Sequence, residues 1–308
     1  MAGINTNRSN ITLPAEVSAE IIQKAQDSSA VMQLARKIAL PGRGLSIPVI
    51  TGDPEAGWVA ETNAKPVSNP SLSTKTMTPY KLAVIVPFSD EFARDASALY
   101  DALVERLPGA LAKKFDNTVF NGSAPGSGFD VLTSCTAQSI DVNASGEGGF
   151  YSALVAADTD IAAHDGDING FAFSAQARGE MLSALDKDGR PIFINNIAEG
   201  AIPRLIGQPV YYSRGLYFAG NSASGTSGQS GYVAANPDVL GFAGDWTKAM
   251  YGTVEGVKID ISNQATLTIS SSAVNLWEHN MFAVKAEIEV GFVADTYAFN
   301  KIVRSHVG

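Results

Sequence analysis

Gly241-Phe-Ala-Gly-Asp-Trp246 and Asn275-Leu-Trp-Glu-His-Asn-Met281 are two short motifs that lead into a long alternating segment, Met281 to Val293. Successive side chains of a β-strand point to opposite faces. One face of this segment would carry Phe282, Val284, Ala286, Ile288, Val290 and Phe292. The other face would carry Lys285, Glu287 and Glu289. The pattern predicts a long strand with one buried face. Neither motif holds the residues that an enzyme site would need.

A long helix is predicted over residues 95–121. Its apolar residues recur every four positions: Leu99, Leu103, Leu107, Leu111, Phe115 and Val119. Four residues turn about 400°, so the apolar stripe drifts around the helix and must meet different neighbours along its length. A second alternating strand, Gly256 to Ser262, precedes the long one. Strands with one apolar face and a helix to cover it predict an α+β protein.

Residues 45–89 predict an extended hairpin loop. Leu45–Ile50 and Leu82–Phe88 both resemble strands, and the polar segment between them, Thr51 to Lys81, is long for a structureless loop in a compact domain. An isolated two-stranded ribbon is marginal in water, so its apolar side chains must be covered. These are Trp58, Val59, Val67, Leu72 and Met77. If the subunit cannot cover them, another subunit must.

Residues 1–44 predict an N-terminal arm. A helix is expected to open at Thr12-Leu-Pro, to continue with a loose apolar stripe as far as Ile38, and to end at Pro41-Gly-Arg-Gly44. The arm has five basic and three acidic residues, whereas the whole chain has a net charge of −9. It is either a solvated helix or an arm that lies against a neighbour or faces packaged nucleic acid.

Residues 150–240 predict an inserted α/β region after a loop-rich segment. The expected helices and strands are Tyr151–Ala163, Ala175–Leu185, Gly170–Phe173, Pro209–Tyr212 and Leu216–Ala219. The chain has 308 residues, one cysteine and no basic run, which argues against a sequence-specific reader of DNA. No signal peptide and no stretch of about 20 apolar residues is present, so we expect a soluble protein without a membrane segment.

No catalytic, cofactor-binding or metal-binding residue is predicted. Asp165-Gly-Asp-Ile-Asn-Gly170 matches the start of an EF-hand loop, but position twelve is Gln176, not Glu, which favours a structural turn. The three histidines lack a partner at helical zinc-site spacing, and one cysteine excludes a cysteine-rich zinc site. No phosphate-binding glycine motif or nucleophile elbow occurs. An enzyme site assembled from distant residues is kept as an alternative.

Several motifs, in order along the chain, resemble those of the major capsid protein family of tailed bacteriophages, which has the Hong Kong phage capsid fold. They are Ala56-Gly-Trp-Val-Ala-Glu61, Val86-Pro-Phe-Ser-Asp-Glu-Phe-Ala-Arg-Asp95, Asp188-Gly-Arg-Pro191, Leu205-Ile-Gly-Gln-Pro-Val210, Gly244-Asp-Trp246 and Asn275-Leu-Trp-Glu-His-Asn280. The resemblance implies an N-terminal arm (1–44), an extended loop (45–89), a peripheral domain with a spine helix (90–135 and 240–295) and an axial domain (136–239 and 296–308).

The resemblance also implies self-assembly through pentamers and hexamers into an icosahedral virion shell around double-stranded DNA, in the cytoplasm of a bacterial host. No long charged helical leader precedes the arm, so scaffolding is expected from a separate protein or from a leader already removed. A portal and decoration proteins are further expected partners. A bacterial nanocompartment shell of the same fold is the alternative to a phage capsid.

The residues expected at contacts between subunits lie in the loop, the arm and the long strand. They are Trp58, Val59, Glu61, Val67, Leu72, Met77, Arg36, Lys37, Glu287 and Glu289. Residues 285–289 read Lys-Ala-Glu-Ile-Glu, where the family resemblance implies an arginine near the end, so an ion pair between subunits through that position is not expected. Some relatives cross-link a loop lysine to an asparagine of a neighbour. Lys65 and Lys75 are available, but no cross-link is predicted.

Overall fold

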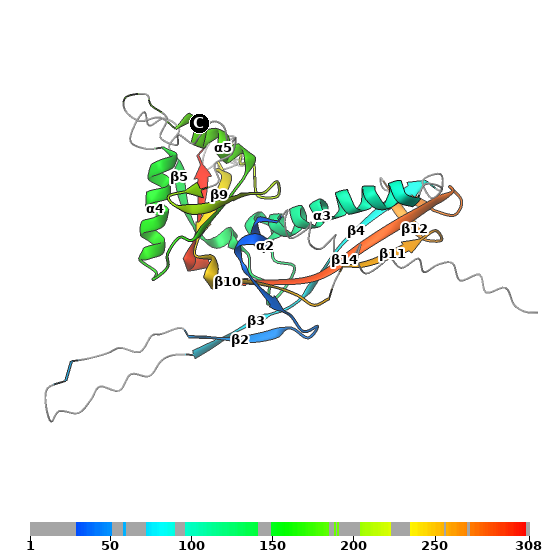
Figure 1. Ribbon diagram of the computed structural model, residues 1–308, viewed down its shortest axis with the longest axis horizontal. Helices are drawn as coiled ribbons and strands as arrows, with labels where there is room; N and C mark the ends of the chain where they lie inside the picture. Colours follow the sequence, from blue (N-terminus) through cyan, green and yellow to red (C-terminus); the bar gives the residue numbers. More distant parts are fainter. Residues whose placement is uncertain are drawn as a thin grey trace, which may run out of the picture.

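The computed structural model describes residues 29–50, 58–59, 72–89, 96–140, 149–184, 188, 190, 204–222, 235–255, 257–269 and 272–305. In this part of the chain one β-sheet runs along a long helix, and a second sheet lies beyond the C-terminal end of that helix (Figure 1). A two-stranded hairpin projects from the body. The mixture of helices and separate sheets confirms the predicted α+β class.

Helix α3 (Ala96–Asn121) confirms the predicted long helix. Leu107 and Leu111 are buried against one end of the sheet that runs beside the helix. Phe115 and Val119 lie one and two turns further on and are buried in a different cluster, which reaches the second sheet. Residues four apart shift gradually around the helix axis. The buried side of α3 therefore contacts the sheet beside it at one point and the cluster that reaches the second sheet further on.

Strand β14 (Met281–Ala294) is the central strand of a five-stranded sheet. Strand β4 (Tyr80–Ser89) pairs with one edge of it, and β10 (Ala249–Thr253) and β11 (Lys258–Ser262) pair with the other. Strand β1 (Arg36–Ala39) adds to β10 in parallel. All six apolar residues predicted on one face of β14 are buried, which confirms the alternating pattern.

The second sheet has six strands in the order β5-β15-β9-β6-β8-β7. Their bounds are Thr136–Ile140, Phe299–Arg304, Asp238–Gly244, Gly170–Phe173, Gln208–Tyr212 and Arg204–Leu205. Helices α4 (Phe150–Ala162) and α5 (Ala175–Ser183) pack on this sheet through a cluster that includes Leu154 and Met181. Both helices and strands β6 and β8 were predicted. The predicted strand Leu216–Ala219 is reduced to one bridge, between Phe218 and Val239.

The motif Gly241 to Trp246 crosses from one sheet to the other. Its first residues belong to β9 in the six-stranded sheet, and the short helix η4 (Trp246–Lys248) then leads into β10 in the five-stranded sheet. At Gly244 a Cβ atom would overlap the ring of Phe299. Trp246 is 2% exposed and packs edge-on against Phe120 and Phe299. Residues 240–244, which were expected in the same domain as the spine helix, thus pair as part of β9 within the six-stranded sheet.

The projecting hairpin consists of β2 (Leu45–Ile50) and β3 (Leu72–Met77), and we call residues 45–77 the finger. Its second strand lies inside the segment expected to be polar and extended. The predicted strand Leu82–Phe88 is part of β4 and pairs with β14, so it belongs to the body and not to the extended loop. The loop expected over residues 45–89 is thus shorter at its C-terminal end.

The described part of the arm differs from the predicted helix. Helix α2 (Ala30–Leu34) is only one turn and a half, and residues 36–39 form strand β1. The helix prediction through Ile38 is wrong because pairing with the edge of β10 overrides a weak helical pattern. The expected helix start near Thr12 lies outside the described residues.

The remaining short elements complete the chain. A small hairpin of β12 (Thr266–Ile269) and β13 (Ser272–Asn275) precedes β14. Short 3-10 turns occur at η2 (Leu132–Ser134) and η5 (Thr296–Ala298), before β5 and β15 respectively.

Candidate inter-subunit surfaces

The base of the finger is held firmly by its own subunit. The Lys75 ammonium lies 2.7 Å from the Asp130 carboxylate and donates a hydrogen bond to the Ala294 carbonyl at 2.5 Å. Met77 is fully buried against Leu40 and Val293. Lys75, one of the two lysines considered for cross-linking, is therefore engaged within its own chain.

Met77 is a correction to the list of expected contacts between subunits. Its side chain has no exposed surface, because it packs over Gly252 of β10 and Gly291 of β14, where the absence of a side chain leaves room for it. A residue already covered by its own subunit has no apolar surface left for a neighbour. Leu72 begins β3, but its side chain is outside the described residues, as are Glu61 and Val67.

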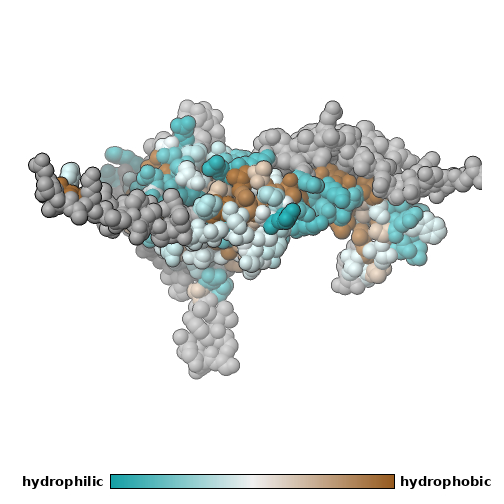
Figure 2. Space-filling model, turned by 90° about the horizontal axis from the view of Figure 1, so that it is seen from below, coloured by the Kyte–Doolittle hydropathy of each residue, from teal (hydrophilic) through white to brown (hydrophobic). Residues whose placement is uncertain are grey.

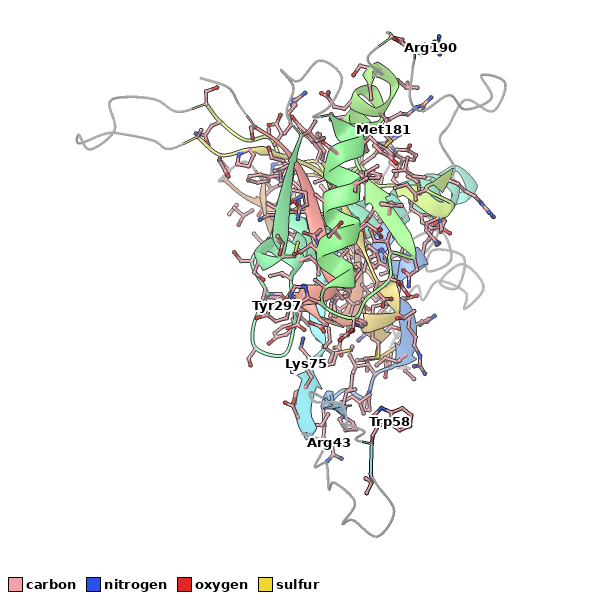
Figure 3. All side chains as sticks on the ribbon, turned by 90° about the vertical axis from the view of Figure 1, so that its left-hand side faces the viewer. Arg43, Trp58, Lys75, Met181, Arg190 and Tyr297 are labelled. Carbon is pink, nitrogen blue, oxygen red and sulfur yellow. The ribbon has the colours of Figure 1, made fainter. Side chains whose placement is uncertain are left out.

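The outer part of the finger contrasts with its base. Trp58 is fully exposed, at 106% of the reference area, and Val59 is exposed at 39%. Figure 3 shows Trp58 on the projecting finger, at the end of the molecule away from Met181 and Arg190. Isolated exposed apolar residues are common, but a tryptophan on a projecting hairpin is an unusual surface residue. These two residues remain predicted contacts.

The two arm residues, Arg36 and Lys37, lie on β1 and are exposed. Within the described residues, β1 has a hydrogen-bonded partner only on its β10 side, so it forms an edge of the five-stranded sheet. Charged side chains on an edge strand discourage uncontrolled pairing with other chains. Their role as contacts with a neighbour stays a prediction.

Glu287 and Glu289 lie on the polar face of β14 and have partners in their own chain. Lys285 lies 3.2 Å from Glu287 and 2.9 Å from Asp260, and Lys81 lies 3.4 Å from Glu289. The hydrogen bond from Lys285 lowers the pKa of Asp260. Exposed ion pairs of this kind contribute little to stability, so these two glutamates could exchange partners during assembly at small cost.

A buried carboxylate joins the arm to the body. Asp116 of α3 accepts hydrogen bonds from the Ser29 hydroxyl at 2.6 Å, from the Ala30 backbone N–H at 3.0 Å and from the Ser213 hydroxyl. Ser29 caps α2, and Ser213 follows β8, so Asp116 connects three segments that are distant in sequence. Burial raises its pKa from 3.8 to about 6, although the hydrogen bonds oppose the shift.

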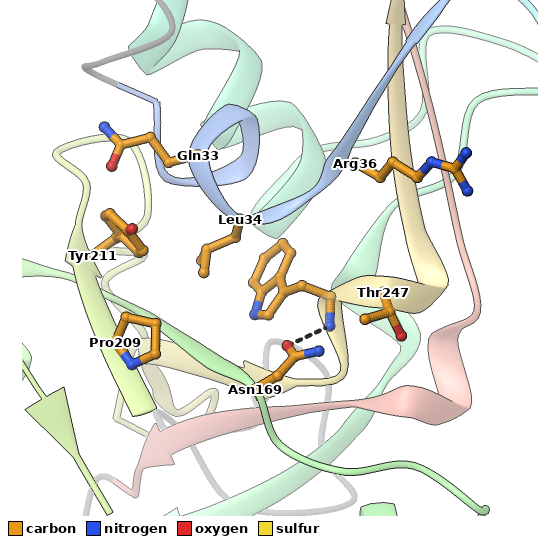
Figure 4. A pocket seen from close by; sticks show the side chains of 8 residues that line it. Gln33, Leu34, Arg36, Asn169, Pro209, Tyr211 and Thr247 are labelled. Atoms are coloured by element: carbon orange, nitrogen blue, oxygen red, sulfur yellow. Dashed lines mark hydrogen bonds between the residues drawn. The ribbon is translucent and has the colours of Figure 1, made fainter. Parts of the chain in front are cut away.

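A pocket of about 510 Å³ opens where the arm, β8 and η4 meet (Figure 4). Its apolar walls are formed by Leu34, Pro209, Tyr211 and the indole of Trp246. The rim is polar and consists of Gln33, Arg36 and Thr247, and Asn169 lies at the floor. We call it the arm pocket. Sequence reasoning missed it, because its residues come from four separate segments and Arg36 was the only one of them predicted as a contact residue.

The local structure fixes the floor of the arm pocket. The Asn169 side-chain oxygen accepts a hydrogen bond from the Trp246 backbone N–H at 2.8 Å, and its amide group donates to Asp245 at 2.7 Å. The Trp246 indole N–H donates to the Gly170 carbonyl at 3.0 Å. The EF-hand-like stretch at residues 165–170 thus supplies a structural contact. No group of three potential metal ligands occurs among the described residues.

Hydrophobic surface is distributed along the molecule. In the view of Figure 2 it occurs in several separate areas, with hydrophilic surface between them. Outside the finger, the exposed large apolar side chains include Trp277 and Tyr297. In the described part of the chain no helix is long and apolar enough to span a membrane. Separate hydrophobic areas, as seen on this face, fit several modest contacts with other molecules better than one large contact.

Comparison with known proteins places this architecture in one family. The profile of the Phage capsid family matches residues 9–303, and the chain belongs to that family. The family is a structural one and not a family of enzymes.

Two relatives and two solved structures illustrate the match. A major capsid protein, gp17, of Mycobacterium phage L5 is 30% identical over 302 residues, which cover 94% of this chain and 88% of the relative. The major capsid protein of Staphylococcus phage 80alpha is 25% identical over 299 residues, 95% of this chain and 85% of the relative. Structures from Mycobacterium phages Cain and Bobi align with TM-scores of 0.71 and 0.70 at 18% and 19% identity, with 100% of this chain and 96% of each structure covered. At that identity they show the fold alone.

Proposed function

We propose that this protein is the major capsid protein of a tailed bacteriophage and that it assembles through pentamers and hexamers into an icosahedral shell around double-stranded DNA. The observation that carries this proposal is the match of nearly the whole chain to relatives named as major capsid proteins. The match includes both the finger and the two sheets, so the function does not rest on one isolated domain.

The shape of the subunit supports assembly. A two-stranded hairpin is marginal in water by itself, and the outer finger exposes Trp58 completely. Among the described residues, strand β1 of the arm has no partner on its outer side, which leaves an edge for a further contact. Contacts between different surfaces of identical subunits generate rings when the rotation closes. A finger that covers the next copy around a ring provides such a contact.

The charge of the chain agrees with a container and not with a reader of DNA. The net charge is −9 and no basic run is present, so packaged DNA would be enclosed without sequence-specific binding. We expect assembly in the host cytoplasm, with a separate scaffolding protein, a portal and decoration proteins as partners. A nanocompartment shell of the same fold would enclose protein cargo, and the phage relatives favour the viral alternative.

Electron microscopy of the purified full-length protein tests the proposal. We expect closed particles or capsomer rings, and particles recovered from a phage lysate should contain nuclease-protected double-stranded DNA. Particles that enclose only a host enzyme would favour the nanocompartment. A protein that remains monomeric at high concentration, with and without a co-expressed scaffolding protein, would contradict the proposal.

A further inference from the structure

The arm pocket has the composition of a receptor for an aromatic side chain. Tyr211, Leu34 and Pro209 are partly buried, and Trp246 closes the bottom with its indole fixed by the hydrogen bond to Gly170. Arg36 is exposed on the rim. Residues that dominate binding at protein interfaces are enriched in Trp, Tyr and Arg and surround well-packed pockets. The pocket volume of about 510 Å³ is enough for an aromatic ring with adjoining backbone.

The outer finger carries an aromatic side chain, Trp58, whose chemistry matches the apolar lining of the arm pocket. Trp58 is fully exposed and follows Gly57, so its backbone can approach another surface closely. Residues 51–71 contain three acidic residues, Asp53, Glu55 and Glu61, and one basic residue, Lys65. Arg36 lines the pocket and is its one basic lining residue. A segment with three acidic residues and one basic residue beside an exposed indole therefore complements an apolar pocket that has an arginine on its rim.

We propose that Trp58 of one copy inserts into the arm pocket of the next copy. The inference rests on the proposed function, because it names the receptor for the finger within the shell. The ligand and the receptor are on different parts of the same chain, so each copy gives one contact and receives one. This head-to-tail arrangement continues around a pentamer or a hexamer until the ring closes. It also assigns a joint role to residues predicted separately, Trp58 on the finger and Arg36 on the arm.

Cross-linking of the full-length protein tests the contact. Val59→Cys places a thiol next to Trp58, and Thr247→Cys places one on the exposed rim of the pocket. The native Cys135 is buried, and burial raises the pKa of its thiol to about 12, so little of it is the reactive thiolate at neutral pH, and the protein without added cysteines serves as the control for it. The double variant is assembled, treated with a short bis-maleimide and separated on a denaturing gel, while electron microscopy records whether particles form.

The expected result is a ladder of covalent oligomers that ends at pentamers and hexamers. Adding Trp58→Ala should reduce the ladder at least about tenfold, as expected for loss of a dominant interface side chain. The matched control pairs Val59→Cys with Val155→Cys, which is exposed on α4, a helix that contributes no residue to the pocket lining. That control should give no more oligomer than Val59→Cys alone.

The remaining outcomes separate this inference from the proposed function. Particles without a ladder, an equal ladder from the α4 control, or a ladder that survives Trp58→Ala would each overturn the contact. If residues 1–28 of the same chain fill the pocket, cross-linking will occur only after those residues are removed, which also overturns it. Absence of any particle counts against the proposed function itself, whereas a ladder without closed particles still supports the contact.

Discussion

Two tryptophans, Trp246 and Trp58, show how differently two regions of this subunit are built. Trp246 lies at the junction of the two sheets, is 2% exposed and donates a hydrogen bond to the backbone of another strand. Trp58 lies on the outer finger and is fully exposed. The first side chain has its partners in its own chain. The second has apolar area that the described residues of its own chain leave uncovered, so we expect the subunit fold and the assembly to depend on different residues.

Replacing Trp246 should have the largest effect on the isolated subunit. Trp246→Ala removes a buried side chain that contacts Phe120 and Phe299 at the junction, and such changes cost about 3–5 kcal/mol of unfolding free energy. Urea unfolding of the unassembled protein measures it. Trp277→Ala, at a side chain that is 71% exposed, is the matched control and should change stability by no more than about 0.5 kcal/mol. If Trp246→Ala and Trp277→Ala lowered the unfolding free energy by the same amount, the structural role of Trp246 at the junction of the two sheets would be contradicted.

Met77 tests whether the base of the finger belongs to the subunit or to the interface. Met77→Ala should lower the unfolding free energy by about 2–5 kcal/mol, because it leaves a cavity beside Leu40 and Val293. Trp58→Ala on the same finger should leave the subunit stability within about 0.5 kcal/mol of the original value. If Met77→Ala leaves the unfolding free energy unchanged and weakens only assembly, Met77 belongs to the interface between subunits and not to the core of its own subunit.

Asp116 predicts a pH dependence in the docking of the arm. Its pKa is about 6 in the folded protein and 3.8 in the unfolded chain, so folding takes up a proton between these values. Stability from this group is therefore greatest below about pH 4 and decreases by roughly 3 kcal/mol as the pH rises to about 6. The difference in unfolding free energy between the original protein and Asp116→Asn isolates this group. The unfolding free energy of the original protein minus that of Asp116→Asn should fall as the pH rises, and a value that is constant or that rises would contradict the assignment.

The Lys81–Glu289 pair should give the smallest effect. Its side chains are 65% and 34% exposed, so Glu289→Gln should cost the subunit less than about 1 kcal/mol. Light scattering of assembly, compared with Asp260→Asn on the same sheet face, shows whether Glu289 also contacts a neighbour. A loss of assembly much larger than the loss of stability supports the predicted contact. Equal small losses for both variants remove Glu289 from the set.

The sequence was sufficient for the elements whose pattern is local. The four-residue period of α3 and the alternation of β14 follow from chain geometry, and both elements have nearly the bounds predicted. Strand β1 was missed because its pairing with β10 is a tertiary contact that its short sequence does not encode. The place of strand β9 was missed for a similar reason, since the motif that ends it crosses between the two sheets.

The sequence predicted that contacts between subunits exist, but it did not predict which residues make them. Apolar residues on a predicted hairpin indicate that something covers them, but Met77 and Trp58 lie in the same polar segment, Thr51 to Lys81, and have opposite burial. The arm pocket was not predictable, because residues 33–36, 169, 209–211 and 246–247 meet only in the folded chain. The family resemblance supplied the order of the parts and not these contacts.

An electron cryo-microscopy map of the assembled particle tests the central claim most directly. We predict that the outer finger of every copy lies on the adjacent copy, with the side chain of Trp58 covered by that neighbour. A map in which the finger folds back onto its own body and touches no other subunit would contradict this account.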